Sequence, residues 1–151
     1  MLRLNRMTDY SIVVLGALAH RQGEVVATAQ IAALTGLKQP TVAKVAKLLQ
    51  AAGLLTTQRG ANGGYQLVGA PEDVTLVKII EGVEGPIAVN DCVEGAQDPC
   101  AVSNCCFMSN NWNKVNETVR AALDAVTLAD LIDPSQLFPV VATKKAEIAP
   151  H

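Results

Sequence analysis

The chain has 151 residues, of which 50% are hydrophobic, 17% charged and 3% aromatic, and its formal net charge is −2. This composition excludes an intrinsically disordered protein and, because Ala, Val and Leu are abundant, favours packed helices over a β-sandwich. No apolar run approaches the roughly 20 residues of a membrane-spanning helix, so we expect no membrane partner.

The charge is unevenly distributed along the chain. Residues 1–60 carry seven Lys or Arg against two acids, a balance of +5, whereas residues 61–151 carry five against twelve, a balance of −7. A basic N-terminal half can bind phosphates while the acidic half faces elsewhere. The distribution therefore favours nucleic-acid binding, against which the net charge alone would argue.

The N-terminal part predicts three helices. Thr8 can cap a helix that runs through about residue 21, and Thr28 can cap a second helix over 29–35 that ends at Gly36. A third helix is expected over about 39–52, with a proline in its first turn. Two helices joined by a short turn that contains glycine predict a helix-turn-helix.

A hairpin is predicted directly after the third helix. Two β-prone runs, 54–59 and 65–68, flank a tip rich in glycine and asparagine, Gly60-Ala61-Asn62-Gly63-Gly64. In this position the hairpin is the wing of a winged helix-turn-helix. We therefore assign residues 1–70 to a DNA-binding domain.

The remaining sequence predicts helices on either side of a long loop. Thr75 can cap a helix that ends near Glu84, residues 87–105 lack periodicity, and a long helix is expected over about 106–124. Apolar residues in and just after the long helix recur at 3-4-3-4 spacing, which is typical of a seam that packs on another helix. The seam residues are Trp112, Val115, Val119, Ala122 and Val126. A last short helix begins near Thr127. We group 71–133 as linker helix, cysteine loop and dimerisation helix, and 134–151 as a flexible tail, so the predicted fold is mainly α.

The third helix has the division of faces that a recognition helix needs. Its apolar face is formed by Val42, Val45, Ala46 and Leu49, and its other face is polar. Polar residues near the N-terminus of such a helix reach base edges or phosphates, and a basic wing residue can enter a minor groove. An ordinary helix with a solvated face has the same pattern, but the wing and the charge distribution favour DNA binding. The candidate DNA contacts are Lys38, Gln39, Thr41, Lys44, Lys47, Arg59, Gly60 and Asn62.

The long loop contains a cysteine motif. Cys92, Cys100 and Cys106 follow C-x7-C-x5-C spacing, and Cys105 lies beside the last. Thiolates bind zinc and iron–sulfur clusters, and a metal can organise a loop of this length. The spacing is unlike the C-x2-C pairs of most structural zinc sites. Two alternatives stay open: inert thiols, which the polar neighbours disfavour, and a disulfide switch that uses Cys105 or Cys106.

The N-terminus resembles a signal peptide only weakly. The apolar run over 11–19 has nine residues, and Asp9 and Tyr10 interrupt the approach to it. We therefore expect a cytoplasmic protein, in which clustered cysteines favour metal or redox chemistry over structural disulfides.

Together these segments resemble the bacterial winged-helix iron–sulfur regulators that include IscR, NsrR, RirA and the SUF-operon repressors. The resemblance covers about residues 1–133, and the combination of wing and cysteine loop makes it specific. It implies a homodimer whose long helices cross, a cluster on each protomer and a partly palindromic DNA operator. The matching motifs are the opening Met1-Leu2-Arg3-Leu4 with Thr8-Asp9-Tyr10, the wing Arg59-Gly60-Ala61-Asn62-Gly63-Gly64-Tyr65, the three cysteines, and Trp112 six residues after Cys106.

The resemblance also implies a set of cluster ligands. The last cysteine of the family lies six residues before the tryptophan, which selects Cys106 over Cys105 as the third thiol ligand. IscR-type members have a histidine three residues after that cysteine, where this chain has Ser109. In the NsrR-like branch an aspartate near the start of the first helix binds the partner's cluster, and Asp9 occupies the matching place. Asp9 is equally well explained as a first-turn acid that complements the helix dipole.

The sequence thus predicts a dimeric DNA-binding transcription factor, a repressor of iron–sulfur assembly or iron-homeostasis genes, with a [4Fe–4S] cluster favoured over [2Fe–2S]. The alternatives are a regulator switched by thiol oxidation without metal and a nitric-oxide sensor of the same fold. An enzyme is not expected, because the sequence has no recognisable nucleophile–base pairing or phosphate-binding loop.

Overall fold

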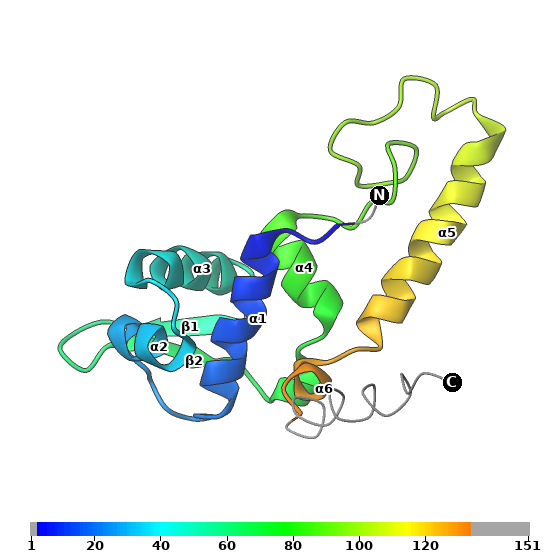
Figure 1. Ribbon diagram of the computed structural model, residues 1–151. Helices are drawn as coiled ribbons and strands as arrows, with labels where there is room; N and C mark the ends of the chain where they lie inside the picture. Colours follow the sequence, from blue (N-terminus) through cyan, green and yellow to red (C-terminus); the bar gives the residue numbers. More distant parts are fainter. Residues whose placement is uncertain (1–2, 134–151) are drawn as a thin grey trace, which may run out of the picture.

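The computed structural model describes residues 3–133, in which a winged helix-turn-helix is followed by a helical extension (Figure 1). The winged part consists of α1 (Arg6–Ala19), α2 (Thr28–Thr35), α3 (Gln39–Ala51), β1 (Leu55–Gln58) and β2 (Gly64–Leu67). The extension consists of the 3₁₀ helix η1 (Pro71–Asp73), α4 (Leu76–Glu84), α5 (Phe107–Asp124) and α6 (Leu128–Leu131). The mainly helical fold with a two-stranded wing is therefore confirmed, and the predicted tail over 134–151 lies outside the described residues.

The wing is an antiparallel hairpin that is attached to the helices by a third segment. Leu55 pairs with Leu67 at one end of the hairpin, and both side chains are buried. Val26, just before α2, exchanges two backbone hydrogen bonds with Tyr65 of β2, each 2.9 Å long. This pairing fixes the hairpin against the helix-turn-helix.

The first helix begins earlier than the sequence predicted. Asn5 is the N-cap of α1, and its Oδ1 accepts a hydrogen bond from the backbone N–H of Met7 at 2.9 Å. Thr8, the predicted cap, lies within the first turn and is fully buried. Its hydroxyl donates to Oε1 of Glu84 at the end of α4. The predicted cap was wrong because the helix begins three residues earlier, where the side chain of Asn5 accepts the capping hydrogen bond, while the Thr8 hydroxyl donates to a distant carboxylate.

The other predicted caps were nearly correct. Thr28 is the first residue of α2 rather than its cap, and the N-cap Ala27 donates its backbone N–H to Oε1 of Gln30 at 3.2 Å. Thr75 caps α4 as predicted, since its Oγ1 accepts the backbone N–H of the residue three positions on at 3.4 Å. Thr127 caps α6 in the same way at 3.3 Å.

One main core joins the winged part to the extension. Val14, Leu15 and Leu18 of α1 pack with the buried face of α3 and with the hairpin. Val74, Ile79 and Leu128, which come from beyond residue 70, lie in the same core. Burying this apolar surface is the main source of stability for the fold.

α5 extends away from the winged part, and the loop that carries the cysteines lies at its N-terminal end (Figure 1). After α5 the chain returns to the main core, where the backbone N–H of Leu128 donates to the carbonyl of Val74 at 2.7 Å. A second, smaller apolar cluster of Val77, Ile80 and Ile87 lies between α4 and α5, with Leu123 packed against it. None of the described helices is long and apolar enough to cross a membrane.

Candidate nucleic-acid interface and cysteine-lined cavity

α3 presents the two faces that the sequence predicted. Val42, Val45, Ala46 and Leu49 are all fully buried, so the helix is held firmly against the core. The opposite face is open to solvent, which leaves its side chains free to meet a duplex. The predicted contacts Lys38, Gln39, Lys44 and Lys47 are exposed, and Thr41 is half-buried.

The tip of the wing is also exposed. Arg59, Gly60 and Asn62 lie in the turn between β1 and β2, and all three are accessible to solvent. Gly60 has a φ of +112°, a backbone conformation that residues with side chains rarely adopt. The tip therefore keeps its shape through glycine and presents one basic side chain.

Two further glycines of the wing, Gly63 and Gly64, allow close contacts between backbone segments of the protein. A Cβ at Gly64 would overlap the carbonyl of Val26, and one at Gly63 would overlap the carbonyl of Gln58. These glycines are required by close backbone contacts within the chain: Gly64 lies against the segment before α2, and Gly63 lies against the turn of the wing.

The four cysteines lie in the loop before α5 and at the N-cap of that helix. Cys92, Cys100 and Cys106 are half-buried, Cys105 is exposed, and none forms a disulfide. Backbone hydrogen bonds shape the loop: the N–H of Cys100 donates to the carbonyl of Asp91 at 2.8 Å. The N–H of Cys92 donates to Oδ1 of Asn90 at 3.1 Å. These bonds bring the first and second cysteines of the motif toward each other.

The thiols are close enough to influence one another. The pKa of the Cys92 thiol is raised, first by removal from solvent, then by a hydrogen bond with Cys100 and by the negative charges of Cys100, Cys106 and Asp91. A cavity of about 560 Å³ is lined by Cys92, Cys105 and Cys106, together with Asn113 of α5. A cation bound in this cavity would stabilise the thiolate forms, which burial and the neighbouring negative charges disfavour.

Thiol groups are the chemical type of ligand that zinc and iron–sulfur clusters require. Within residues 3–133, however, no three or more His, Cys, Asp or Glu side chains are arranged to hold a metal ion as they stand. The thiols therefore lie near one another without closing around a single point. The thiols influence one another on a segment without a helix or strand, whose conformation can adjust when a metal binds.

The structure does not bring every predicted ligand to the cysteines. Asp9 is exposed in the first turn of α1 and does not line the cysteine cavity of the same chain. Ser109, which stands where IscR-type members have histidine, donates its hydroxyl to the carbonyl of Cys106 at 2.9 Å. Its side chain is thereby engaged with the first turn of α5.

Two asparagines next to the cysteines were missed in the sequence. Asn113 and Asn116 of α5 form hydrogen bonds with backbone groups of the loop. The signal that could have found them is their i, i+3 spacing in the middle of a helix, where asparagine is intrinsically unfavourable and points to a specific partner.

Comparison with known proteins places this geometry in a family. The model of the Rrf2 family, described as "Iron-dependent Transcriptional regulator", matches residues 4–134. The HTH-type transcriptional regulator NsrR of Bacillus subtilis is 31% identical over 132 residues, which cover 87% of this chain and 90% of that protein.

Solved structures agree with this assignment. CymR, the global cysteine regulator of B. subtilis, superposes with a TM-score of 0.65 at 28% identity, covering 87% of this chain and 97% of that one. IscR of T. potens superposes with a TM-score of 0.60 at 26% identity, covering 99% and 94%. The family consists of regulators rather than enzymes. The winged helix-turn-helix, the cysteine loop and a family match over most of its length show that the chain belongs to the Rrf2 family of DNA-binding transcriptional regulators.

Proposed function

We propose that this protein is a homodimeric transcriptional repressor whose DNA binding depends on an iron–sulfur cluster held by Cys92, Cys100 and Cys106. The observation that carries the proposal is the proximity of these three thiols, since Cys92 interacts with both Cys100 and Cys106, and Cys92 and Cys106 line one cavity, in a chain with an exposed recognition helix. When bound, the cluster supplies a centre that is sensitive to iron supply and oxidants. The genes that we expect it to control serve iron–sulfur assembly or iron homeostasis, and a regulator that binds chromosomal DNA works in the cytoplasm.

The DNA-binding residues are proposed from exposure and charge. The N-terminal half of α3 would enter the major groove, where Gln39 and Thr41 can reach base edges and the lysines can meet phosphates. Arg59 at the wing would reach the adjacent minor groove. Two such units in a dimer fit a partly palindromic operator.

The partner copy is proposed to pack on α5. Trp112 and Val115 remain 36% and 44% exposed on this helix, although both belong to the predicted apolar seam. A helix that leaves apolar residues in water at regular spacing gains stability when a second helix covers them. Asp9, exposed on α1, would then supply a fourth ligand to the cluster of the partner subunit and favour [4Fe–4S] over [2Fe–2S].

A metal-free thiol switch is the second candidate. Cys105 is exposed and lines the same cavity as Cys92 and Cys106, so an oxidised thiol there has a partner within the loop. The similarity to CymR is compatible with this function, since that protein is described as a cysteine regulator rather than an iron regulator. A nitric-oxide sensor of the same fold would use the same cluster ligands and differ only in its signal.

The test is the iron and acid-labile sulfide content, with the visible spectrum, of protein purified without oxygen. We expect about four irons per chain and broad absorption near about 400 nm, as for a thiolate-bound [4Fe–4S] cluster. Cys92→Ala and Cys106→Ala should abolish this content, whereas the matched control Cys105→Ala should retain it. Zinc in place of iron would overturn the cluster proposal and leave a structural site. No metal together with a reversible disulfide that requires Cys105 would replace the cluster proposal with the thiol switch.

A further inference from the structure

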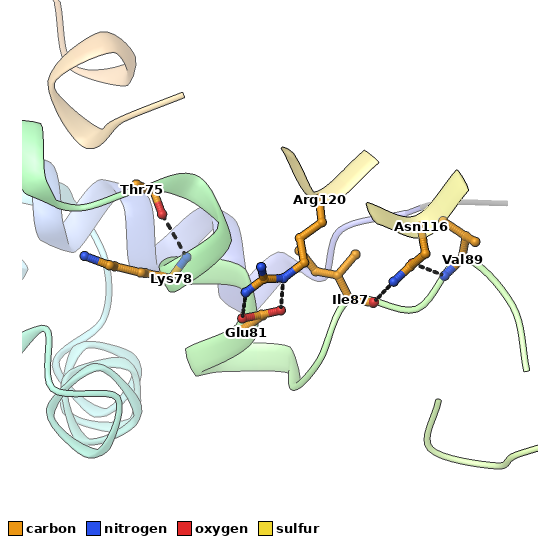
Figure 2. A network of polar contacts seen from close by, with 7 residues as sticks. All are labelled: Thr75, Lys78, Glu81, Ile87, Val89, Asn116 and Arg120. Carbon is orange, nitrogen blue, oxygen red and sulfur yellow. Dashed lines mark hydrogen bonds and ion pairs between the residues drawn. The ribbon is translucent and has the colours of Figure 1, made fainter. Parts of the chain in front are cut away.

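Asn116 of α5 holds the start of the cysteine loop by two hydrogen bonds (Figure 2). Its Nδ2 donates to the carbonyl of Ile87 at 2.9 Å, and its Oδ1 accepts from the backbone N–H of Val89 at 3.0 Å. Asn116 is only 9% exposed, so both bonds are largely shielded from water. The carboxamide therefore pairs with residues 87–89 as a neighbouring β-strand would pair with them.

A second contact lies one helical turn away on the same face of α5. Oδ1 of Asn113 accepts from the backbone N–H of Glu94 at 3.0 Å. Positions 113 and 116 are three residues apart, so their side chains project from one side of the helix. Cys92 lies between the two attachment points at residues 89 and 94, which fix the segment that carries it.

The third polar contact on this side of α5 connects the helix to α4. Arg120, four residues after Asn116, forms a two-pronged ion pair with Glu81, with distances of 3.0 and 3.1 Å (Figure 2). The contacts of Asn113, Asn116 and Arg120 therefore join the cysteine loop, α5 and α4 along one line. Because the ion pair is partly exposed, we expect it to contribute less than the two asparagines to the attachment of the cysteine loop.

Asparagine is the side chain that the contact at position 116 requires. The backbone of 87–89 offers the carbonyl of Ile87 as an acceptor and the N–H of Val89 as a donor. A short carboxamide carries a matching NH₂ donor and oxygen acceptor on the same carbon atom. Aspartate would accept from Val89 but leave the carbonyl of Ile87 unsatisfied, and it would place a charge at a buried position. Leucine would satisfy neither group.

We propose that Asn113 and Asn116 are positioning residues that clasp the Cys92 segment to α5, so that the arrangement of the cysteine loop and the direction of α5 change together. The inference rests on the proposed function, in which Cys92 holds the cluster and α5 pairs the two protomers. Through this clasp a change at the cysteines alters the spacing of the two recognition helices. Such coupling requires that α5 has two arrangements and that both the cysteine loop and the bound DNA favour one arrangement over the other.

The first experiment measures the clasp in protein without metal, so its outcome is independent of the cluster. The rate at which iodoacetamide alkylates each cysteine is followed by mass spectrometry in the parent protein and in Asn113→Ala and Asn116→Ala variants. We expect Cys92 to react about tenfold faster in either variant, because local opening of its segment is no longer opposed by the hydrogen bonds of the clasp. The exposed Cys105 should react at an unchanged rate.

Asn111→Ala is the matched control. Asn111 is an exposed asparagine of the same helix whose side chain contacts only Met108 of its own turn. Its replacement should leave the Cys92 rate within twofold of the parent. If Asn116→Ala fails to fold, the half-buried Asn113 still provides the test. An unchanged Cys92 rate in the folded variants would overturn the clasp.

The second experiment measures coupling. DNA affinity is determined for the loaded and the metal-free forms of each variant, and the ratio of the two affinities is compared. We expect the ratio to fall at least fivefold toward unity in Asn116→Ala, with the visible circular dichroism of the loaded protein altered, and to stay unchanged in Asn111→Ala. A parent-like ratio in Asn116→Ala would overturn the coupling. A parent protein that binds no cluster would contradict the proposed function and leave the alkylation result standing.

Discussion

Thr8 is buried in the first turn of α1, and its hydroxyl donates to Oε1 of Glu84, which also accepts the backbone N–H of Asn5 at 2.7 Å. Glu84 is the last residue of α4, where a carboxylate opposes the helix dipole. The same carboxylate lies at the N-terminus of α1, where the dipole and two donors stabilise it. This side chain therefore links the start of α1 to the end of α4.

Replacing Thr8 with valine tests this contact at nearly constant volume. We expect Thr8→Val to lower the free energy of unfolding by about 1–3 kcal/mol, because a partly buried carboxylate loses a donor. Urea denaturation measures the change. Thr118→Val on α5 is the control, since Thr118 is exposed and donates only to a carbonyl of its own helix. Equal losses in the two variants would argue against a special role for Thr8.

Replacing Arg59 tests whether the wing contacts DNA. If it contacts phosphates, Arg59→Ala should weaken binding to duplex DNA and reduce by about one the slope of log affinity against log salt concentration. Fluorescence anisotropy with a labelled duplex, over a series of salt concentrations, gives this slope. Arg21→Ala removes another exposed arginine, one that lies 3.8 Å from Glu24, and should leave the slope unchanged. An unaltered slope in Arg59→Ala would remove this residue from the interface.

At the scale of elements, α5 is held to the rest of the protomer by few contacts. The small apolar cluster around Ile80 and Ile87, the Asn116 contact and the Glu81–Arg120 ion pair lie along one side of the helix. The hydrogen bond from Arg120, opposed by partial burial, lowers the pKa of Glu81 below its usual value of 4.5. The contribution of the pair to stability is thus present above pH 4.5 and is lost as the pH falls through the lowered pKa.

We therefore expect Arg120→Ala to destabilise the protein only modestly at pH 7, because both side chains are partly exposed, 49% for Arg120 and 29% for Glu81. The difference from the parent protein should shrink as the pH falls below 4.5 through the lowered pKa of Glu81, and it should disappear once Glu81 is protonated in both folded and unfolded chains. Urea denaturation at pH 7 and at a pH low enough to protonate Glu81 measures both. Lys114→Ala, which removes another exposed cation of α5, should have little effect at either pH; a difference that persists at low pH would assign the cost to lost packing.

At the scale of the whole molecule, the proposed dimer makes Asp9 and the cysteines of different protomers parts of one site. Mixed dimers test this arrangement. One protomer carries Asp9→Ala and the other carries Cys106→Ala, with different affinity tags so that only the mixed species is recovered. Ligation across the dimer predicts one cluster per mixed dimer with the lifetime of the parent protein, because one site then has all its ligands. Ligation within a protomer predicts none with that lifetime.

The uneven charge is a property of the whole molecule that the sequence already contains. Four of the seven basic residues of 1–60 lie on or beside α3 and the wing, at 38, 44, 47 and 59. The folded structure keeps the candidate contacts on α3 and the wing in solvent. Attraction of this unit to a polyanion is therefore compatible with an overall charge of −2.

The sequence by itself determined the elements whose signals are local. The apolar period of α3, the turn residues of the wing and the threonine caps of α4 and α6 depend on neighbours within a few residues, so each could be predicted. The cysteine motif, together with the wing, was enough to indicate the family. The identity of its ligand group stays a prediction, since no local pattern specifies how thiols from a loop meet.

Only the tertiary structure decided the contacts between distant residues. Thr8, predicted as a cap, instead donates its hydroxyl to Glu84, 76 positions away, and Gly64 is needed for pairing with Val26. Asn116 meets Ile87 across 29 positions. A hydrogen bond needs two groups within about 3 Å of each other in the right direction, and such proximity is created by the packing of the core rather than by either segment alone.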